Sequence, residues 1–133
     1  MKVVNKRQYI NYHNDATERM RAITLMKNAD YTGTNENPFA NFVGVEAMGI
    51  CSTEQGFLTR MFDKFARIRS FVQKGVLQVK DESVEDTLLD LANYCILMSA
   101  YIKSKKQEYI ESEETSNTHG KPEYERANDA IAP

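Results

Sequence analysis

The stretch DESVEDTLLDLANY, residues 81–94, carries four carboxylates whose types and spacing could do chemistry: Glu82, Glu85, Asp86 and Asp90. Acidic side chains grouped on one helix can hold a divalent cation, because Mg²⁺ prefers oxygen ligands. They can also offset the exposed N–H groups and the dipole at the start of a helix. A third role is to pair with a basic surface. The choice among these roles separates an enzyme from a binding protein.

Asp86, Asp90 and Asn93 form a ladder at i, i+4 and i+7 of the predicted helix, deeper than a capping effect reaches. Asp90 lies between two leucines, so we expect it to be partly buried and therefore paired. Its partner is either a cation of the preceding helix or a divalent ion. A magnesium site needs further carboxylates from a second helix. Helix 52–75 supplies only Glu54 and Asp63, so we predict no metal ligands.

The preceding helix carries a set of basic residues that could pair with these acidic ones. Arg60, Asp63, Lys64 and Arg67 are spaced i, i+3, i+4 and i+7, which places them on one helical face. In one interpretation, the two helices pack antiparallel and their charges pair across the seam, each pair contributing little. In the other, part of the basic set faces a pocket and binds phosphates, which guanidinium groups do well.

The segment KNADYTGTNENPFANF, residues 27–42, combines amide and hydroxyl side chains with aromatic rings. Rings offer a base a face for stacking, and amides offer a donor and an acceptor to a base edge or a ribose. The alternative is a helix end held in the core by Phe39 and Phe42. His13 and His119 have no nucleophile partner at a useful spacing, so the sequence predicts no catalytic residue.

These side chains need helices to position them. Apolar residues recur at three and four positions over residues 5–28, which predicts an amphipathic helix. An ordered loop should follow to about residue 42, because glycine, asparagine and proline break the period. Ser52 with Gln55 predicts a capping box that opens a second helix, which ends near Gly75.

A third helix should begin at Asp81 or Ser83 and end near Lys106, after an extended connector at residues 76–79. The remainder has few large apolar residues and many charges, which cannot offset the entropy lost on ordering. We therefore predict a helical ligand-binding domain at 1–106 and a polar, mobile tail at 107–133.

The chain as a whole predicts an all-α fold, an antiparallel long-helix bundle. It has 133 residues, 41% of them hydrophobic, and a net charge of -2, which suits one domain and gives no reason to expect binding to duplex nucleic acid. The first residues show no apolar core typical of a signal sequence, and no window is long and apolar enough to span a bilayer, so we expect the chain in the cytoplasm. We expect Cys51 and Cys95 to be reduced thiols in or near the core. The two later helices are apolar on more than one side, which predicts a homodimer or a higher homo-oligomer.

KNADY at 27–31, RMFDKFARI at 60–68 and DESVEDTLLDLANY at 81–94 resemble, in that order and spacing, a small phage-associated family, nucleotide modification associated domain type one. The resemblance covers about residues 20–102. The chain also looks similar to the Tad family of phage Thoeris anti-defence proteins. That resemblance implies a homo-oligomeric sponge, dimeric or hexameric, that sequesters cyclic ADP-ribose isomers made by TIR-domain enzymes in the infected bacterial cell. Some members also take up cyclic oligonucleotides.

A protein of this kind binds its ligand without a cofactor and does not degrade it. Its own side chains would then make all the contacts with the ligand. Arg60, Lys64 and Arg67 would meet the pyrophosphate, while Asp90 and Asn93 would meet ribose hydroxyls. Tyr31, Phe39 or Phe42 would flank the adenine. Asn28 and Asp30 complete the predicted ligand-binding set.

Two alternatives stay open. MazG-like and dimeric dUTPase-like pyrophosphohydrolases hold magnesium through E-x-x-E on one helix and E-x-x-D on another, and helix 52–75 has no E-x-x-E. A metal-dependent nucleoside triphosphate pyrophosphohydrolase would therefore rest on the acidic set of residues 81–94. In the second alternative, the chain is an accessory protein of phage nucleotide modification, and its motifs serve only packing.

Overall fold

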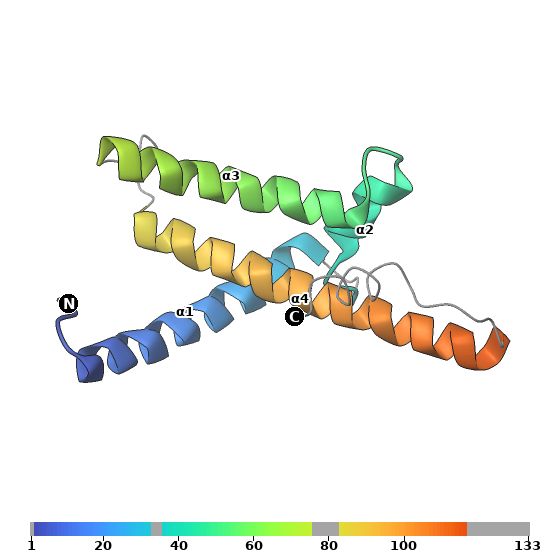
Figure 1. Cartoon of the computed structure of the whole chain (residues 1–133), viewed down its shortest axis with the longest axis horizontal. Coiled ribbons are helices and arrows are strands. Elements are labelled where there is room, and N and C mark those ends of the chain that lie inside the picture. Colours follow the sequence, from blue (N-terminus) through green and yellow to red (C-terminus); the bar gives the residue numbers. More distant parts are fainter. Residues whose placement is uncertain (1, 33–35, 76–82, 117–133) are drawn as a thin grey trace, which may run out of the picture. The chain divides into compact units, whose positions relative to one another are not determined.

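The computed structural model describes residues 2–32, 36–75 and 83–116; within these ranges, the side chains of 28–32 and 116 are outside the description. This part of the chain is all-helical, as the sequence predicts. The helices are α1 (Lys6–Thr32), α2 (Ala40–Ala47), α3 (Thr53–Lys74) and α4 (Val84–Ser116) (Figure 1). Among these four helices, none combines the length and the hydropathy that a bilayer-spanning segment requires. The chain divides into two units, Met1–Met98 and Ser99–Pro133.

Helix α1 opens where the Asn5 side chain accepts a hydrogen bond from the backbone N–H of Gln8, at 2.9 Å. An asparagine oxygen at this place satisfies one of the N–H groups that a helix start leaves without a partner. The helix continues to Thr32, so the prediction that it ends near Asn28 is wrong. Ala16 is its buried apolar residue.

Helix α2 corrects the prediction of a loop up to residue 42. Residues Ala40–Ala47 form two helical turns, in spite of a glycine and two valines that favour a helix weakly. Contacts with α3 stabilise it instead. The ring of Phe42 stacks on that of Phe57, and a Cβ at Gly56 would lie 3.1 Å from Val45 Cγ2, so the two helices approach closely there.

Both ends of α3 agree with the sequence. The Ser52 hydroxyl accepts from the Gln55 N–H at 3.1 Å, and the Gln55 side chain accepts from the Ser52 N–H at 3.0 Å, which is the predicted capping box. The Glu46 carboxylate also accepts from the N–H and the hydroxyl of the buried Thr53, which ties α2 to the first turn of α3. At the other end, Gly75 adopts a left-handed conformation (φ 77°) that glycine tolerates best.

Helix α4 begins after Ser83, whose hydroxyl accepts from the Asp86 N–H at 3.1 Å. Asp81, the other predicted cap, lies outside the described residues, as do the predicted connector 76–79 and residues 117–133 of the predicted tail. The helix runs to Ser116, so the prediction that it ends near Lys106 is wrong.

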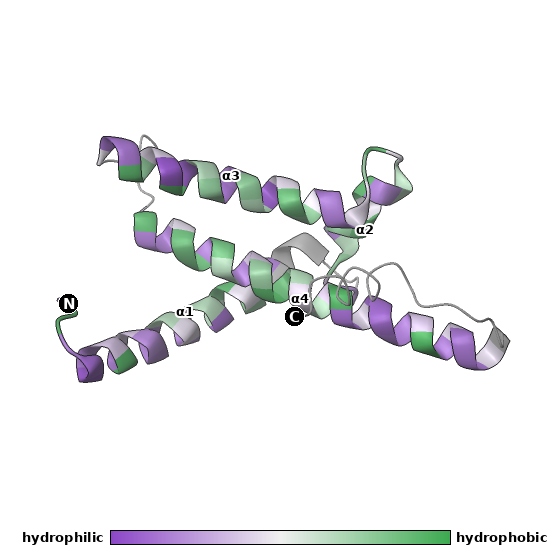
Figure 2. Cartoon of the chain, in the orientation of Figure 1, coloured by the Kyte–Doolittle hydropathy of each residue, from purple (hydrophilic) through white to green (hydrophobic). Residues whose placement is uncertain are grey.

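The second unit consists, in its described part, of the portion of α4 from Ser99 onward. It is mainly hydrophilic (Figure 2). Local contacts support it: Gln107 donates to Glu111 one turn later at 3.3 Å, and Lys105 lies 5.9 Å from the centroid of the Tyr101 ring. Such i, i+4 pairs stabilise a helix by a few tenths of a kcal/mol, roughly.

The buried core of the described residues is small. Phe57 and Ala16 are its apolar members, and Thr53 and Thr87 are buried beside them. Both cysteines are free, but only Cys51 is partly covered, and Cys95 is exposed. The prediction of a core or near-core position is therefore wrong for Cys95.

Candidate functional site

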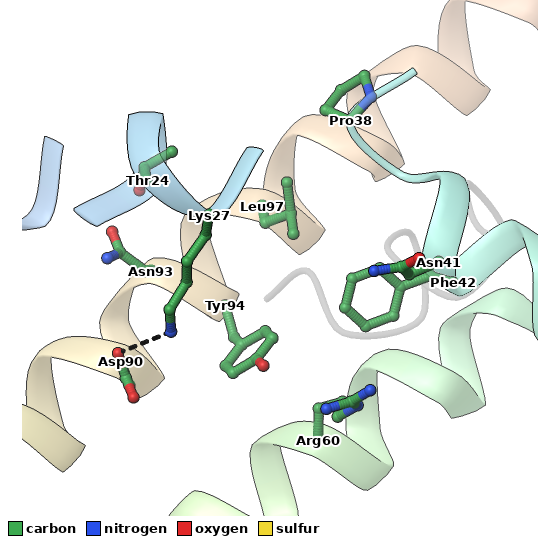
Figure 3. A pocket seen from close by; sticks show the side chains of 10 residues that line it. All are labelled: Thr24, Lys27, Pro38, Asn41, Phe42, Arg60, Asp90, Asn93, Tyr94 and Leu97. Atoms are coloured by element: carbon green, nitrogen blue, oxygen red, sulfur yellow. Dashed lines mark hydrogen bonds and ion pairs between the residues drawn. The ribbon is translucent and has the colours of Figure 1, made fainter. Parts of the chain in front are cut away.

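A hollow of about 110 Å³ lies in the first unit, where side chains from α1, α2, α3 and α4 converge (Figure 3). Its walls are polar and aromatic together. The lining residues are Thr24, Lys27, Pro38, Asn41, Phe42, Arg60, Asp90, Asn93, Tyr94 and Leu97. Segments far apart in the sequence thus supply one site.

Asp90 is the anionic group of this hollow, and two lysines share it. Its Oδ1 lies 3.3 Å from Lys27 Nζ of α1, and its Oδ2 lies 3.2 Å from Lys64 Nζ of α3. The Asp90 side chain is 17% exposed, which agrees with the prediction that it is partly buried and paired. Two ammonium groups against one carboxylate leave this corner of the hollow cationic.

Arg60 supplies a further cation from α3, on the wall that faces α1 in Figure 3. Within residues 2–32, 36–75 and 83–116, no acidic side chain forms an ion pair with it. A guanidinium presents several N–H donors in a fixed plane and binds phosphate oxygens in pairs. Arg60 is exposed, so an incoming ligand can reach it.

Aromatic rings form another part of the lining. Phe42 stacks on the fully buried Phe57, with 3.9 Å between ring centroids and 5° between ring planes. Tyr94 meets Phe42 edge-on, at 6.2 Å and 86°. The stack fixes the Phe42 ring, and the edge contact is a favoured aromatic geometry. Rigid rings beside cationic groups suit a ligand that carries both a base and phosphates.

The ladder of Asp86, Asp90 and Asn93 attaches α1 to α4. Asp86 pairs with Arg19 at 2.6 Å, and the Asn93 amide donates to the Met20 carbonyl at 3.3 Å. Hydrogen bonding to the Ser83 side chain and then to the Arg19 guanidinium holds the pKa of Asp86 below its usual value. Each rung therefore has a structural partner on α1.

The structure brings four of the predicted site residues together in the hollow: Phe42, Arg60, Asp90 and Asn93. Lys64 contacts Asp90 without lining the hollow, and Arg67 pairs with Asp63 on the same helix at 3.5 Å. Phe39 immediately precedes α2 and does not line the hollow. The side chains of Asn28, Asp30 and Tyr31 lie outside the described residues.

Sequence reasoning missed the other six lining residues, which are Thr24, Lys27, Pro38, Asn41, Tyr94 and Leu97. Two of them carried a signal, because Lys27 is the first residue of the KNADY motif and Tyr94 is the last of DESVEDTLLDLANY. Asn41 could not be placed, since it belongs to the helix that was predicted to be a loop.

The acidic residues of α4 do not gather into a metal site. Across the ranges that the structure describes, no group of three or more His, Cys, Asp or Glu side chains is placed to hold a metal ion. Glu82, one of the four candidate carboxylates, lies outside those ranges. Asp86 and Asp90 instead form ion pairs with side chains of α1 and α3.

Comparison with known proteins bears on the same segment. No curated protein and no solved structure matches the chain. Residues 27–103 match the sequence profile of nucleotide modification associated domain 1. This stretch is more than half of the 133 residues, and it contains every residue that lines the hollow except Thr24. The chain therefore belongs to the nucleotide modification associated domain 1 family.

Proposed function

We propose that the chain is a phage counter-defence protein that binds a cyclic ADP-ribose-type signalling nucleotide in the hollow and sequesters it without cleaving it. The proposal rests chiefly on one observation, the placement of Arg60 and Lys27 beside a fixed aromatic ring in one hollow. The similarity of the chain to the Tad family supports the choice of ligand.

The phosphates of such a ligand would meet Arg60 and Lys27. Arg60 can donate two parallel hydrogen bonds to a phosphate, and such charge-assisted bonds are the strong ones. The Lys27 ammonium has three donors and shares its carboxylate with Lys64. It can therefore turn a donor to a phosphate while it keeps Asp90. Both phosphates of a pyrophosphate would then bind between α1 and α3.

The base and sugars would meet the uncharged part of the lining. Phe42 and Tyr94 offer ring surface, and the amides of Asn41 and Asn93 offer donors and acceptors to a base edge or a hydroxyl. A volume of about 110 Å³ is small for a whole nucleotide, since ligand pockets usually measure roughly 300–1,000 Å³. One part of the ligand would enter the hollow, and the rest would lie over its open side.

Retention without cleavage agrees with the environment of Asp90. A magnesium-dependent pyrophosphohydrolase needs carboxylates turned toward the metal, so that a bound water becomes a nucleophile. Asp90 instead forms ion pairs with the ammonium groups of Lys27 and Lys64. A carboxylate paired in this way favours a site that binds an anionic ligand over a site that binds a metal ion. Pyrophosphohydrolysis is the alternative function that an experiment must separate from sequestration.

The test is to incubate the purified chain with the product of a TIR-domain enzyme, remove free ligand, denature by heat, and identify what is released by mass spectrometry. We expect the intact cyclic compound. Release of a hydrolysed product, or formation of pyrophosphate from a nucleotide panel with Mg²⁺, would instead support the enzyme. Failure both to retain a nucleotide and to form pyrophosphate would overturn both functions proposed for the hollow.

Arg60→Ala should weaken retention, because it removes charge-assisted hydrogen bonds of about 1.5–3 kcal/mol, roughly a 10- to 100-fold loss of affinity. Arg67→Ala is the matched control. It removes the same charge from the same helix, but Arg67 pairs with Asp63 and does not line the hollow. Titration calorimetry measures both. Equal losses in the two variants would indicate general charge attraction and contradict the assignment of Arg60.

A further inference from the structure

The outer side of α3 carries a row of large apolar side chains that the described chain leaves uncovered. Leu58, Phe62, Phe65 and Val72 are 56%, 64%, 55% and 76% exposed. Figure 2 shows hydrophobic residues recurring along the whole length of this helix. We call these four residues the α3 stripe. Isolated exposed apolar residues are ordinary, but several of them along one side of a helix mark an interaction surface.

The spacing of the α3 stripe is that of a helix–helix seam. Its members follow one another at steps of four, three and seven residues, and Arg69 occupies the intermediate position of the last step. A four–three alternation keeps side chains on one side of a helix that packs along another helix. The opposite side of α3 is already used, since Thr53 and Phe57 are buried and Lys64 reaches Asp90. The stripe therefore needs a partner outside the described chain.

We propose that a second copy of this chain covers the α3 stripe, with its own α3 running antiparallel to the first. A two-fold axis between Phe62 and Phe65 places Phe62 of each copy against Phe65 of the other. Leu58 then lies against the aliphatic stem of Arg69 in the second copy. The surface is self-complementary, as a two-fold interface requires. This inference does not depend on the ligand proposed for the hollow.

Charge selects the antiparallel direction. In that arrangement, Arg69 of one copy points toward the first turn of α3 in the second copy, where Glu54 lies one turn before Leu58. A long arginine side chain can cover apolar surface with its stem while its guanidinium reaches such a carboxylate. A parallel pair would instead place the two Arg69 guanidinium groups against each other, which is unfavourable. Few other charges lie beside the stripe, because Gln55, Thr59, Ala66 and Gln73 flank it.

The corner between α2 and α3 extends the same surface. Met48 and Ile50 precede α3 and are also exposed. Antiparallel pairing brings Val72 of the second copy, near the far end of its helix, to this corner. The interface thus gains apolar area at both ends of the seam, which a stable dimer needs in addition to one row of side chains.

Sedimentation equilibrium of the full chain over a wide concentration range tests the pairing, and we expect a dimer. Phe65→Glu should raise the dissociation constant by about 100-fold or more, because it places a charge in the centre of the seam from both copies. Ile10→Glu is the matched control, since Ile10 on α1 is also 55% exposed. Circular dichroism shows whether each variant stays helical. A wild-type chain that is monomeric throughout, or a dimer that Ile10→Glu disrupts and Phe65→Glu does not, would overturn the proposal.

A charge exchange tests the direction without altering the apolar stripe. Arg69→Glu should weaken the dimer by about 10-fold, and the double variant Glu54→Arg/Arg69→Glu should recover most of that loss, because the opposite charges meet again. Failure of the double variant to recover would contradict the antiparallel pairing. Binding of a different protein at the stripe, with no self-association, would identify another occupant and contradict the second copy.

Discussion

Most of the ion pairing around the hollow involves a single residue, Asp90. It bonds to Lys27 on α1 and to Lys64 on α3 while it belongs to α4 itself. The sequence predicted its partial burial, because two leucines flank it, and it left the partner open between a cation of helix 52–75 and a divalent ion. It did not predict Lys27, since the distance between residues 27 and 90 along the chain carries no information about their distance in space.

Asp90→Asn should lower the free energy of unfolding by about 1–3 kcal/mol, between the values for exposed and for fully buried ion pairs. The amide keeps the shape but loses the charge, so both lysines are left beside a neutral group. Asp63→Asn is a suitable control, because the Asp63–Arg67 pair joins two residues of one helix and Asp63 is 61% exposed. Chemical denaturation measures both variants, and equal losses would contradict the central place of Asp90.

Asp86 makes stability depend on acidic pH. Ser83 and Arg19 hold its pKa in the folded chain below the usual 3.8. The resulting stabilisation is fully present above pH 3.8, and it is lost as the pH falls through the lowered pKa of the folded state. Because the Asp86 side chain is 43% exposed, we expect less than about 1 kcal/mol. The difference in unfolding free energy between wild type and Asp86→Asn should shrink toward pH 2, and a difference independent of pH would refute this account.

Among the helices, α2 shows where secondary structure cannot be predicted from the local sequence. Its segment ANFVGVEA follows a proline and contains a glycine and two valines, so helix propensity is weak and no sequence period stands out. The Phe42–Phe57 stack and the close approach at Gly56 stabilise it from outside. The end of α4 fails for a related reason, because a polar helix without an apolar stripe shows no period to detect. The long helices were predictable because their caps and apolar periods agree.

The start of α3 offers a direct test of the local signals. Ser52→Ala removes the side-chain oxygen of the capping box and should lower stability by about 1 kcal/mol, or about 4 °C in melting temperature for a chain of this length. Ser70→Ala, in the interior of the same helix, is the control and should be neutral or slightly stabilising, since alanine favours helix interiors. Thermal melts followed by circular dichroism compare the two. A Ser52→Ala chain as stable as wild type would show that the Glu46–Thr53 contact alone fixes this end.

For the molecule as a whole, the hollow is a property of four helices together. The sequence identified the chemistry on α3 and α4, because Arg60, Asp90 and Asn93 stand at regular helical spacing. It could not identify Thr24 and Asn41, since their role depends on how α1 and α2 pack. It also assigned Arg67 to the site, whereas that residue lies about two turns beyond Arg60 and pairs with Asp63. Helical spacing shows which residues share a face. It does not show at which point along that face a neighbouring helix packs.

A ligand that touches all four helices must stabilise the folded chain, because it binds that state and not the unfolded one. At a free concentration 100 times its dissociation constant, the gain is about 2.7 kcal/mol. We expect the proposed cyclic nucleotide to raise the melting temperature accordingly, and more at low salt than at high salt, because its phosphates meet Arg60 and Lys27. Differential scanning fluorimetry at two ionic strengths measures this. Arg60→Ala should lose most of the shift, and Phe65→Glu should keep it. If instead Arg60→Ala responded as wild type does, the ligand would bind elsewhere on the chain, and the hollow would be only a gap in the packing of the four helices.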